Sequence, residues 1–235
     1  MHIKDSIALV TGANRGLGLA FTQALLAGGA RKVYAAAREP ASVKQPGVQA
    51  VRLDVTKPKE IDAAARDFGD VTLLINNAGI ASSAGFLSAG GVDTLRAELD
   101  TNFFGPLLTS RAFAPVLAKN GGGAIINVLS ALSWVSLPNY STYSATKAAA
   151  WSFSNGLRNE LRGQGTQVLA LHVGYMDTDM VRHVTAPKSK PDDVAKQVLA
   201  ALEAGKSEVL ADDISRGIKQ SLSADPGVYL LPPAA

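Results

Sequence analysis

Short apolar runs alternate with longer helix-forming segments along almost the whole chain, and this alternation limits the possible folds more than any other feature. Strands that are buried on both faces of a parallel sheet read as continuous apolar runs, because neither face meets water. The runs with this character are residues 6–10, 32–37, 48–54, 72–76, 124–130, 167–173 and 207–211. Helices between parallel strands supply right-handed crossovers. The sequence therefore predicts an α/β fold with a doubly wound parallel sheet of about seven strands, flanked by helices.

One domain accounts for all 235 residues, because no linker, repeat or low-complexity segment interrupts the alternation. The segments with helical character are residues 18–29, 59–69, 92–119 and 144–163. Residues 37–47 join two predicted strands but contain two prolines, which leaves little room for a helix. We expect a single domain over residues 1–235. Its loop near residues 175–193 either covers a site or is a plain surface connection.

Composition excludes several classes of function. The chain has no cysteine, which excludes disulfides and thiolate chemistry and fits a reducing compartment. Its formal net charge of +3 is not concentrated in any stretch basic enough for a nucleic-acid groove. No apolar run approaches the roughly twenty residues that a membrane-spanning helix needs. Three scattered histidines, His2, His172 and His183, lack metal-ligand spacing. We expect a cytoplasmic protein that binds no nucleic acid, no membrane and no metal.

A glycine-rich turn follows the first predicted strand. In TGANRGLG, the residues Gly12, Gly16 and Gly18 stand between the end of the strand and the start of a helix. Glycines there let backbone N–H groups approach a pyrophosphate at the helix N-terminus, where the helix dipole favours negative charge. The alternative is a helix start that needs glycine for packing alone, since the G-x-x-x-G-x-G spacing differs from the commoner G-x-G-x-x-G pattern.

The end of the second predicted strand bears on the choice of cofactor. Proteins that bind NAD usually place Asp or Glu there to hold the ribose 2′-hydroxyl. This chain has Ala37 at that position, followed by Arg38, and Arg15 lies within the glycine-rich turn. Guanidinium groups bind phosphate through charge-assisted hydrogen bonds. The two arginines together favour the 2′-phosphate of NADP(H) over NAD(H), although either one alone is more often a solvated side chain.

Four motifs in order make the chain recognisable. TGANRGLG is followed by NNAG at residues 76–79, by Ser130 and by YSATK at residues 143–147, with thirteen positions from Ser130 to Tyr143. Together they resemble the short-chain dehydrogenase/reductase family over nearly the whole chain. The resemblance implies a single NAD(P)-binding Rossmann-fold domain and hydride transfer between a nicotinamide cofactor and a carbonyl or alcohol. The catalytic residues that it implies are Ser130, Tyr143, Lys147 and Asn102.

The roles of these residues follow from the resemblance, with one addition from electrostatics. Tyr143 would protonate the carbonyl oxygen on reduction and act as the base in the reverse direction. Lys147 shares a helix face with it at i+4, so the ammonium group is expected to lower the pKa of the phenol. The family lysine also holds the nicotinamide ribose. Ser130 would hydrogen-bond the substrate oxygen. Asn102 would hold a water through its backbone carbonyl, and a purely structural role is the alternative.

The resemblance extends to cofactor contacts. The residues that match the cofactor-binding positions of the family are Gly12, Asn14, Arg15, Gly16, Leu17, Gly18, Arg38, Asp54, Val55, Asn77, Ala78, Gly79, Tyr143, Lys147, Gly174, Met176 and Thr178. One departure concerns Val173-Gly174, where the family usually has Pro-Gly. Loss of the proline frees a backbone N–H and relaxes a fixed φ, so the loop that faces the nicotinamide is expected to sit differently or to be more mobile.

The expected substrate pocket is apolar and aromatic. Its residues are Ser130, Leu132, Leu137, Tyr140, Tyr143, Tyr175 and Met180, with Trp134 and Val181 beside them. No lysine or arginine is expected to point inward, so a neutral hydrophobic ketone or aldehyde fits better than an anion. The alternative is that these apolar side chains belong to the core.

These features predict an NADPH-dependent reductase of a ketone or aldehyde, or an alcohol dehydrogenase in the reverse direction. A non-enzymatic NADP-binding regulator on the same fold is the main alternative, although the complete Ser-Tyr-Lys set argues against it. A lyase or epimerase is disfavoured, because such relatives usually carry a larger C-terminal domain. The short spacing from Ser130 to Tyr143 leaves no room for the extra helix of monomeric family members. A homodimer or homotetramer is therefore expected. Its candidate interface comprises the helices that start near Val92 and Thr142, including Trp151 and Phe153.

Overall fold

The computed structural model describes residues 1–182 and 184–230, and these residues form a seven-stranded sheet in which every neighbouring pair is parallel. The strands are β1 (Ile7–Thr11), β2 (Lys32–Ala37), β3 (Gln49–Arg52), β4 (Leu73–Asn76), β5 (Ala124–Val128), β6 (Gln167–His172) and β7 (Glu208–Leu210). Their order is β3-β2-β1-β4-β5-β6-β7, which confirms the predicted doubly wound fold. The order reverses between β1 and β4, and sheets of this kind bind ligands at the carboxyl ends of the strands beside that reversal.

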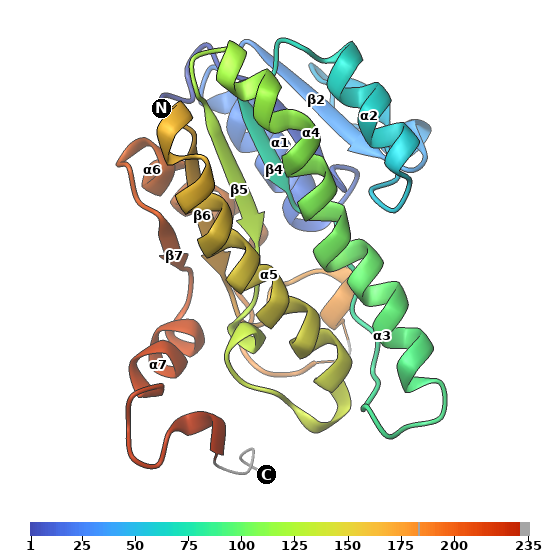
Figure 1. The fold of residues 1–235 in the computed structure, drawn as a ribbon, viewed down its shortest axis with the longest axis vertical. Coiled ribbons are helices and arrows are strands. Elements are labelled where there is room, and N and C mark those ends of the chain that lie inside the picture. The colour runs from blue at the N-terminus through green and yellow to red at the C-terminus, as the bar shows by residue number, and fades with distance from the viewer. Residues whose placement is uncertain (183, 231–235) are drawn as a thin grey trace.

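Helices cover both faces of the sheet (Figure 1). The helices are α1 (Gly16–Ala27), α2 (Pro58–Asp67), α3 (Gly91–Leu99), α4 (Gly105–Lys119), α5 (Ser141–Glu160), α6 (Pro191–Glu203) and α7 (Asp213–Ser221). Residues of α1 and α6 share one hydrophobic cluster with the strands, and residues of α2, α4 and α5 share the other. Figure 1 shows α3 and α7 extending past the carboxyl ends of the strands, so segments far apart in the sequence flank that edge.

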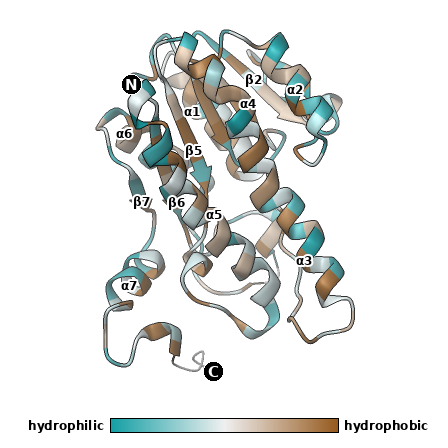
Figure 2. Ribbon diagram, viewed as in Figure 1, coloured by the Kyte–Doolittle hydropathy of each residue, from teal (hydrophilic) through white to brown (hydrophobic). Residues whose placement is uncertain are grey.

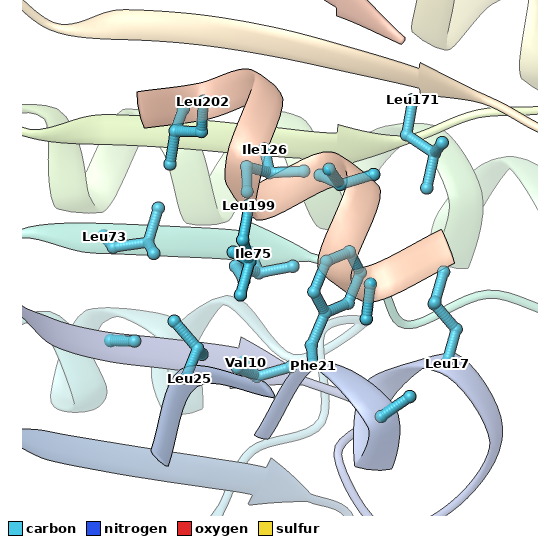
Figure 3. Packing of buried hydrophobic residues seen from close by; sticks show 14 of the residues in the cluster. Val10, Leu17, Phe21, Leu25, Leu73, Ile75, Ile126, Leu171, Leu199 and Leu202 are labelled. Carbon is cyan, nitrogen blue, oxygen red and sulfur yellow. The ribbon is translucent and has the colours of Figure 1, made fainter. Parts of the chain in front are cut away.

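Neighbouring side chains of the central strands supply the two clusters. Val10 belongs to the α1–α6 side and Leu9 to the other side. Figure 3 shows the first cluster, in which strand residues meet Phe21 and Leu25 of α1. Full burial of a side chain of this size contributes about 1.5–3 kcal/mol, so burial on both faces explains why the strands read as unbroken apolar runs.

One predicted helix differs from the structure. The segment 92–119 is not a single α-helix, because a π-helical turn, Asp100–Phe104, separates α3 from α4. Pro106 has no N–H and cannot donate the α-helical hydrogen bond to the carbonyl of Asn102. The side chain of Asn102 is also hydrogen-bonded to the backbone of Ile80, outside the helix. Turns of this kind occur frequently at functional sites.

Two predicted strands, residues 48–54 and 124–130, end two residues early, at Arg52 and Val128. Just beyond each strand a side chain accepts a hydrogen bond from the backbone two residues further on, Asp54 from Thr56 and Ser130 from Leu132. The connection 37–47 contains only a short 3₁₀ turn, Pro40–Ser42, as its prolines predicted.

Hydropathy follows the layers of the fold. In Figure 2 the central strands are mostly hydrophobic, whereas α2 carries hydrophilic residues among hydrophobic ones. None of the helices in the described part of the chain is both long enough and apolar enough to cross a membrane.

Candidate active site

Ser130 and Tyr143 meet at the carboxyl edge of the sheet, as the motif spacing predicted. Ser130 lies two residues beyond β5 and is the N-cap of a 3₁₀ turn, Ala131–Ser133, where its hydroxyl accepts a hydrogen bond from the backbone N–H of Leu132 at 3.1 Å. Tyr143 lies in the first turn of α5, and its hydroxyl is hydrogen-bonded to the Ser130 side chain. The cap fixes the serine oxygen and the helix fixes the phenol, so the two hydroxyls share one site.

The phenol of Tyr143 is held in its protonated form. Burial of the hydroxyl raises its pKa to about 12, against a smaller lowering effect of the Ser130 hydrogen bond, and the nearby carboxylate of Glu98 raises it further. A protonated phenol at neutral pH is suited to act as a general acid.

Lys147 does not lower the pKa of Tyr143 in this structure, so that prediction is wrong. The lysine is almost fully buried, and its Nζ donates to the carbonyl oxygen of Val128 at 2.9 Å while lying 5.6 Å from the centre of the Tyr143 ring. Burial lowers the pKa of Lys147 to about 8. Desolvation opposes charge on both groups, and it exceeds the attraction that the i+4 spacing suggested.

Replacement of Lys147 by Met is expected to remove a pH-dependent cost to stability. The unfolded lysine keeps its proton up to its ordinary pKa of 10.5, whereas the folded one loses it near 8, so between these values the unfolded state binds more protons. Wild-type stability should therefore rise from pH 8 to 10 relative to the variant, by on the order of 2–3 kcal/mol. Urea unfolding of both proteins across this range tests it. Parallel pH curves for the two proteins would contradict it.

Asn102 joins three elements beneath the site. Its Nδ2 donates to the carbonyl of Ile80 at 2.8 Å and to Oγ1 of Thr146 at 3.1 Å, and its Oδ1 accepts from the N–H of Ile80 at 2.9 Å. A Cβ built on Gly79 would lie 3.2 Å from Asn102 Oδ1 and 3.9 Å from Lys147 Nζ. The residue therefore connects the NNAG turn to α5, and the predicted role of its backbone carbonyl stays a prediction.

The glycine-rich turn has the shape that a dinucleotide phosphate requires. Helix α1 begins without a side-chain cap and without an acidic residue in its first turn, so nothing negative competes for its first N–H groups. Gly12 has a φ of +66°, in the left-handed region. A Cβ on Gly18 would lie 2.1 Å from the carbonyl oxygen of Gly12, so only glycine fits there. These features fit a bound nicotinamide dinucleotide.

The environment of the second strand end matches the expectation of a missing acid. Ala37 is buried and Arg38 is exposed directly after it. Asp54 lies near enough for the charge of Arg38 to act on it. Burial acts to raise the pKa of Asp54, but hydrogen bonds from Thr56 and the charge of Arg38 lower it overall. Arg15 is differently placed, because its Nη1 pairs with Asp179 Oδ2 of the 175–193 loop at 3.1 Å.

The remaining expected cofactor residues border this edge. Asn77 Nδ2 donates to the Thr11 carbonyl at 2.9 Å, and the N–H of Ala78 donates to Thr11 Oγ1 at 3.0 Å, so the NNAG turn is fastened to the end of β1. A Cβ on Gly16 would lie 3.2 Å from Cγ2 of Thr178, which places that threonine beside the glycine-rich turn. Two other expected residues pack nearby: the side chain of Leu17 lies in the core, and Val55 packs against Gly105. Asn14 is half-buried in the glycine-rich turn.

The Val173-Gly174 segment is held by a residue that the sequence did not reveal. The N–H of Gly174 donates to Asp212 Oδ2 at 2.6 Å, while Oδ1 of the same carboxylate caps α7 through Ser215. Met176 pairs with Ser189 in an isolated parallel bridge that closes the 175–189 part of the loop. Asp212 lies 38 positions from Gly174, so no local pattern could indicate this contact.

A cavity of about 490 Å³ lies between the loop after NNAG, the residues just before α5 and the 175–193 loop. Its walls are Ala81, Ser83, Asn139, Tyr140, Met180 and Val184. Of the expected substrate residues, Tyr140 and Met180 line this cavity, and Ser130, Leu132, Leu137, Tyr143 and Tyr175 do not. Trp134 is also absent from the wall, because it stacks on His172. The loop after NNAG could have been found from topology, since it leaves the carboxyl end of β4. His183, in the same loop region, lies outside the described residues.

Known proteins resemble this chain in sequence. A family model described as short chain dehydrogenase matches residues 6–189. The chain is 31% identical to dehydrogenase/reductase SDR family member 7B of Bos taurus, over 90% of this chain and 75% of that protein. It is 32% identical to an uncharacterized oxidoreductase of Staphylococcus aureus, over 85% of this chain and 92% of that protein.

Solved structures agree with the sequence comparison. A short chain dehydrogenase from Burkholderia cenocepacia, solved in complex with NADP, is 43% identical and superposes with a TM-score of 0.92, covering 96% of both chains. A short-chain dehydrogenase from Streptomyces avermitilis is 28% identical, with a TM-score of 0.84 over 94% of both chains. The chain therefore belongs to the short-chain dehydrogenase/reductase family and is an oxidoreductase that works with a nicotinamide cofactor.

Proposed function

We propose that this protein reduces a neutral, apolar ketone or aldehyde with NADPH, or oxidises the corresponding alcohol in reverse. The observation that carries the proposal is the protonated phenol of Tyr143, which is hydrogen-bonded to Ser130 and lies one helical turn from Lys147. These groups lie at the same sheet edge as the glycine-rich turn, so the Tyr143 phenol would lie next to the expected cofactor as a proton donor.

When bound, NADPH would supply the hydride for the carbonyl carbon, and the residues of the site supply the proton. The Ser130 hydroxyl, which the Leu132 N–H holds in place, orients the substrate oxygen. Tyr143 transfers its phenolic proton to that oxygen, so an alcohol forms. A solvent proton then returns to the phenolate, and until it does the Ser130 hydrogen bond favours the charged form. Asn102 keeps the lysine-bearing helix fastened to the NNAG turn.

The cavity supports a neutral substrate. Ala81, Met180 and Val184 are apolar, and Ser83 and Asn139 are polar but uncharged. Among the residues that the structure describes, no charged side chain lines the cavity, so an anionic substrate would lose hydration without gaining a partner there. Consumption of NADPH, followed at 340 nm against a panel of ketones and aldehydes, tests the activity. Tight NADPH binding with no turnover on any member of the panel would instead favour a non-enzymatic NADP-binding regulator.

Three observations support NADP(H) over NAD(H). Arg38 is exposed at the end of β2, Ala37 leaves no carboxylate to repel a 2′-phosphate, and a similar protein at 43% identity was solved with NADP. Arg15 lies in the same turn and is engaged with Asp179, so Arg38 is the principal candidate for the phosphate contact.

Replacement of Arg38 by Ala is expected to raise the KM for NADPH by about tenfold to a hundredfold, because a charge-assisted contact to phosphate is lost. The KM for NADH should stay nearly the same, since NADH has no 2′-phosphate. The matched control is Arg31→Ala, an exposed arginine just before the start of β2, which should leave both values unchanged. An equal rise for both cofactors in the Arg38 variant would refute the assignment.

We also propose a homodimer or homotetramer that packs through α4 and α5. Phe104, an exposed aromatic residue between α3 and α4, and the neighbouring Phe103 and Phe153 support this surface, because the three rings form a contiguous aromatic group. A cytoplasmic location is proposed on the absence of cysteine.

A further inference from the structure

We propose that His172 is a positioning residue that holds Ser130 in place for the reaction, an inference that rests on the proposed function. His172 is the last residue of β6 and is fully buried. Its Nδ1 lies 3.1 Å from the backbone carbonyl oxygen of Ser130. It does not line the cavity, so it acts on Ser130 and not on the substrate.

The hydrogen on the imidazole is assigned by its partner. A carbonyl oxygen only accepts hydrogen bonds, so Nδ1 must carry a hydrogen. The same carbonyl accepts a second hydrogen bond from the N–H of Ser133 at 3.0 Å, and both of its lone pairs are thereby used.

The ring is uncharged at neutral pH. Burial lowers the pKa of His172 to about 4, although the Ser130 carbonyl and Glu208 act to raise it, and the charges of Lys219 and Lys147 lower it further. A neutral imidazole has a single N–H, and in His172 this N–H, on Nδ1, donates to the Ser130 carbonyl. The other nitrogen, Nε2, lies 3.7 Å from Glu208 Oε1 and makes no hydrogen bond.

Aromatic and charged neighbours fix the orientation of the ring. Trp134 stacks on it with ring centres 3.9 Å apart and an angle of 16° between planes. Trp151 of α5 packs edge-on against Trp134 at 6.2 Å. Lys219 of α7 lies 5.1 Å above the Trp134 ring and forms an ion pair with Glu208 of β7. The imidazole therefore cannot turn its N–H away from Ser130 without disturbing three elements.

The consequence concerns the peptide that follows Ser130. The serine hydroxyl is fixed by Leu132, but that cap depends on the orientation of the Ser130 backbone. The N–H of Ala131 on the other side of the peptide donates to the Val173 carbonyl at 3.0 Å. His172, the last residue of β6, and the adjacent Val173 are thus hydrogen-bonded to the two polar groups of one peptide, the carbonyl of Ser130 and the N–H of Ala131. Loss of the imidazole N–H would leave the Ser130 carbonyl with only the hydrogen bond from Ser133 and would loosen the serine oxygen.

The experiment compares two variants. His172→Asn keeps an N–H donor near the position of Nδ1, whereas His172→Phe keeps a stacked ring and removes the donor. With NADPH and the best carbonyl substrate, His172→Phe should lower kcat by about tenfold, the usual value of one hydrogen bond, and His172→Asn should stay within about threefold of wild type. The KM for the substrate and the Kd for NADPH should change little in either variant.

Stability separates a positioning role from a purely structural one. Asn loses the stacking on Trp134, so under the positioning proposal His172→Asn should have the lower Tm of the two variants and yet the higher kcat. Under a purely structural role, kcat should follow Tm. Activity that simply follows Tm in both variants, or a full kcat in His172→Phe, would overturn the proposal.

A second measurement keeps this test separate from the proposed function. The carbonyl ¹³C chemical shift of Ser130 reports its hydrogen bonding without any turnover. It should move in His172→Phe and stay close to wild type in His172→Asn. Absence of turnover in the wild type, together with this shift pattern, would reject the reductase and leave the positioning contact intact. An unmoved shift in His172→Phe would reject the contact itself.

Discussion

Tyr143→Phe is expected to lower kcat by about 10²–10⁴-fold, the usual contribution of a positioned general acid. Phenylalanine keeps the ring in the first turn of α5 and removes only the hydroxyl that is hydrogen-bonded to Ser130. With no proton available at that position, hydride transfer to the carbonyl carbon would leave an uncompensated alkoxide. The Kd for NADPH should stay within about tenfold of wild type, since at most one hydrogen bond to the cofactor is lost.

The matched control is Tyr34→Phe. That hydroxyl is hydrogen-bonded to Lys32 and Asp70 at the other end of β2, away from the site, so its loss should leave kcat unchanged. Single-turnover measurements with NADPH in excess separate chemistry from cofactor binding. Retention of most of the activity in Tyr143→Phe would show that another group supplies the proton, and the proposed mechanism would be wrong.

Gly18→Ala is expected to lower kcat/KM for NADPH by about 10²-fold or more, because displacement of a binding loop by about 1 Å has effects of this size. The added Cβ would lie 2.1 Å from the carbonyl oxygen of Gly12 and 2.6 Å from Nδ2 of Asn77. The first neighbour is backbone and cannot rotate away. Either α1 or the turn before it must move, and both hold the surface expected to contact the phosphates. Overpacking of this kind also costs about 1–3 kcal/mol of stability.

Gly217→Ala is the matched control, because a Cβ there has no atom within 4 Å. Gly217 is exposed in the middle of α7, and alanine should stabilise the protein by about 0.4–1 kcal/mol by reducing the entropy of the unfolded chain. Fluorescence titration with NADPH and urea unfolding measure the two effects. Normal NADPH binding by the Gly18 variant would show that the close packing of this turn is not what forms the cofactor surface.

Local patterns were sufficient for most of the architecture. Burial on both faces makes each strand a continuous apolar run, so the seven strands could be recognised before their partners were known. The helix predicted over residues 92–119 failed for a reason that is only partly local. Pro106 could have indicated an irregular turn, but the hydrogen bonds between Asn102 and Ile80, 22 positions away, complete it.

Motif spacing likewise predicted that Ser130, Tyr143 and Lys147 share one site, but the pKa shift that it predicted for Tyr143 is wrong. The i+4 spacing says that two side chains share a helix face, and it says nothing of how much water surrounds them. The fold buries Lys147 and desolvates the hydroxyl of the half-buried Tyr143, so the pKa of the phenol rises and that of the lysine falls. Desolvation depends on every element packed around a group, and for that reason it cannot be read from a short segment.

The amino-acid sequence by itself determined the parallel α/β fold, the glycine-rich turn and the identity of the expected catalytic residues, because these depend on periodicity and on short motifs. Only the tertiary structure decided which groups are charged, which residues line the cavity, and that Asp212 and His172 support Gly174 and Ser130. Those contacts join residues 38 and 42 positions apart. The first exists because β7, which precedes Asp212, pairs with β6, and the second because β6 pairs with β5. No local pattern of side chains encodes either proximity.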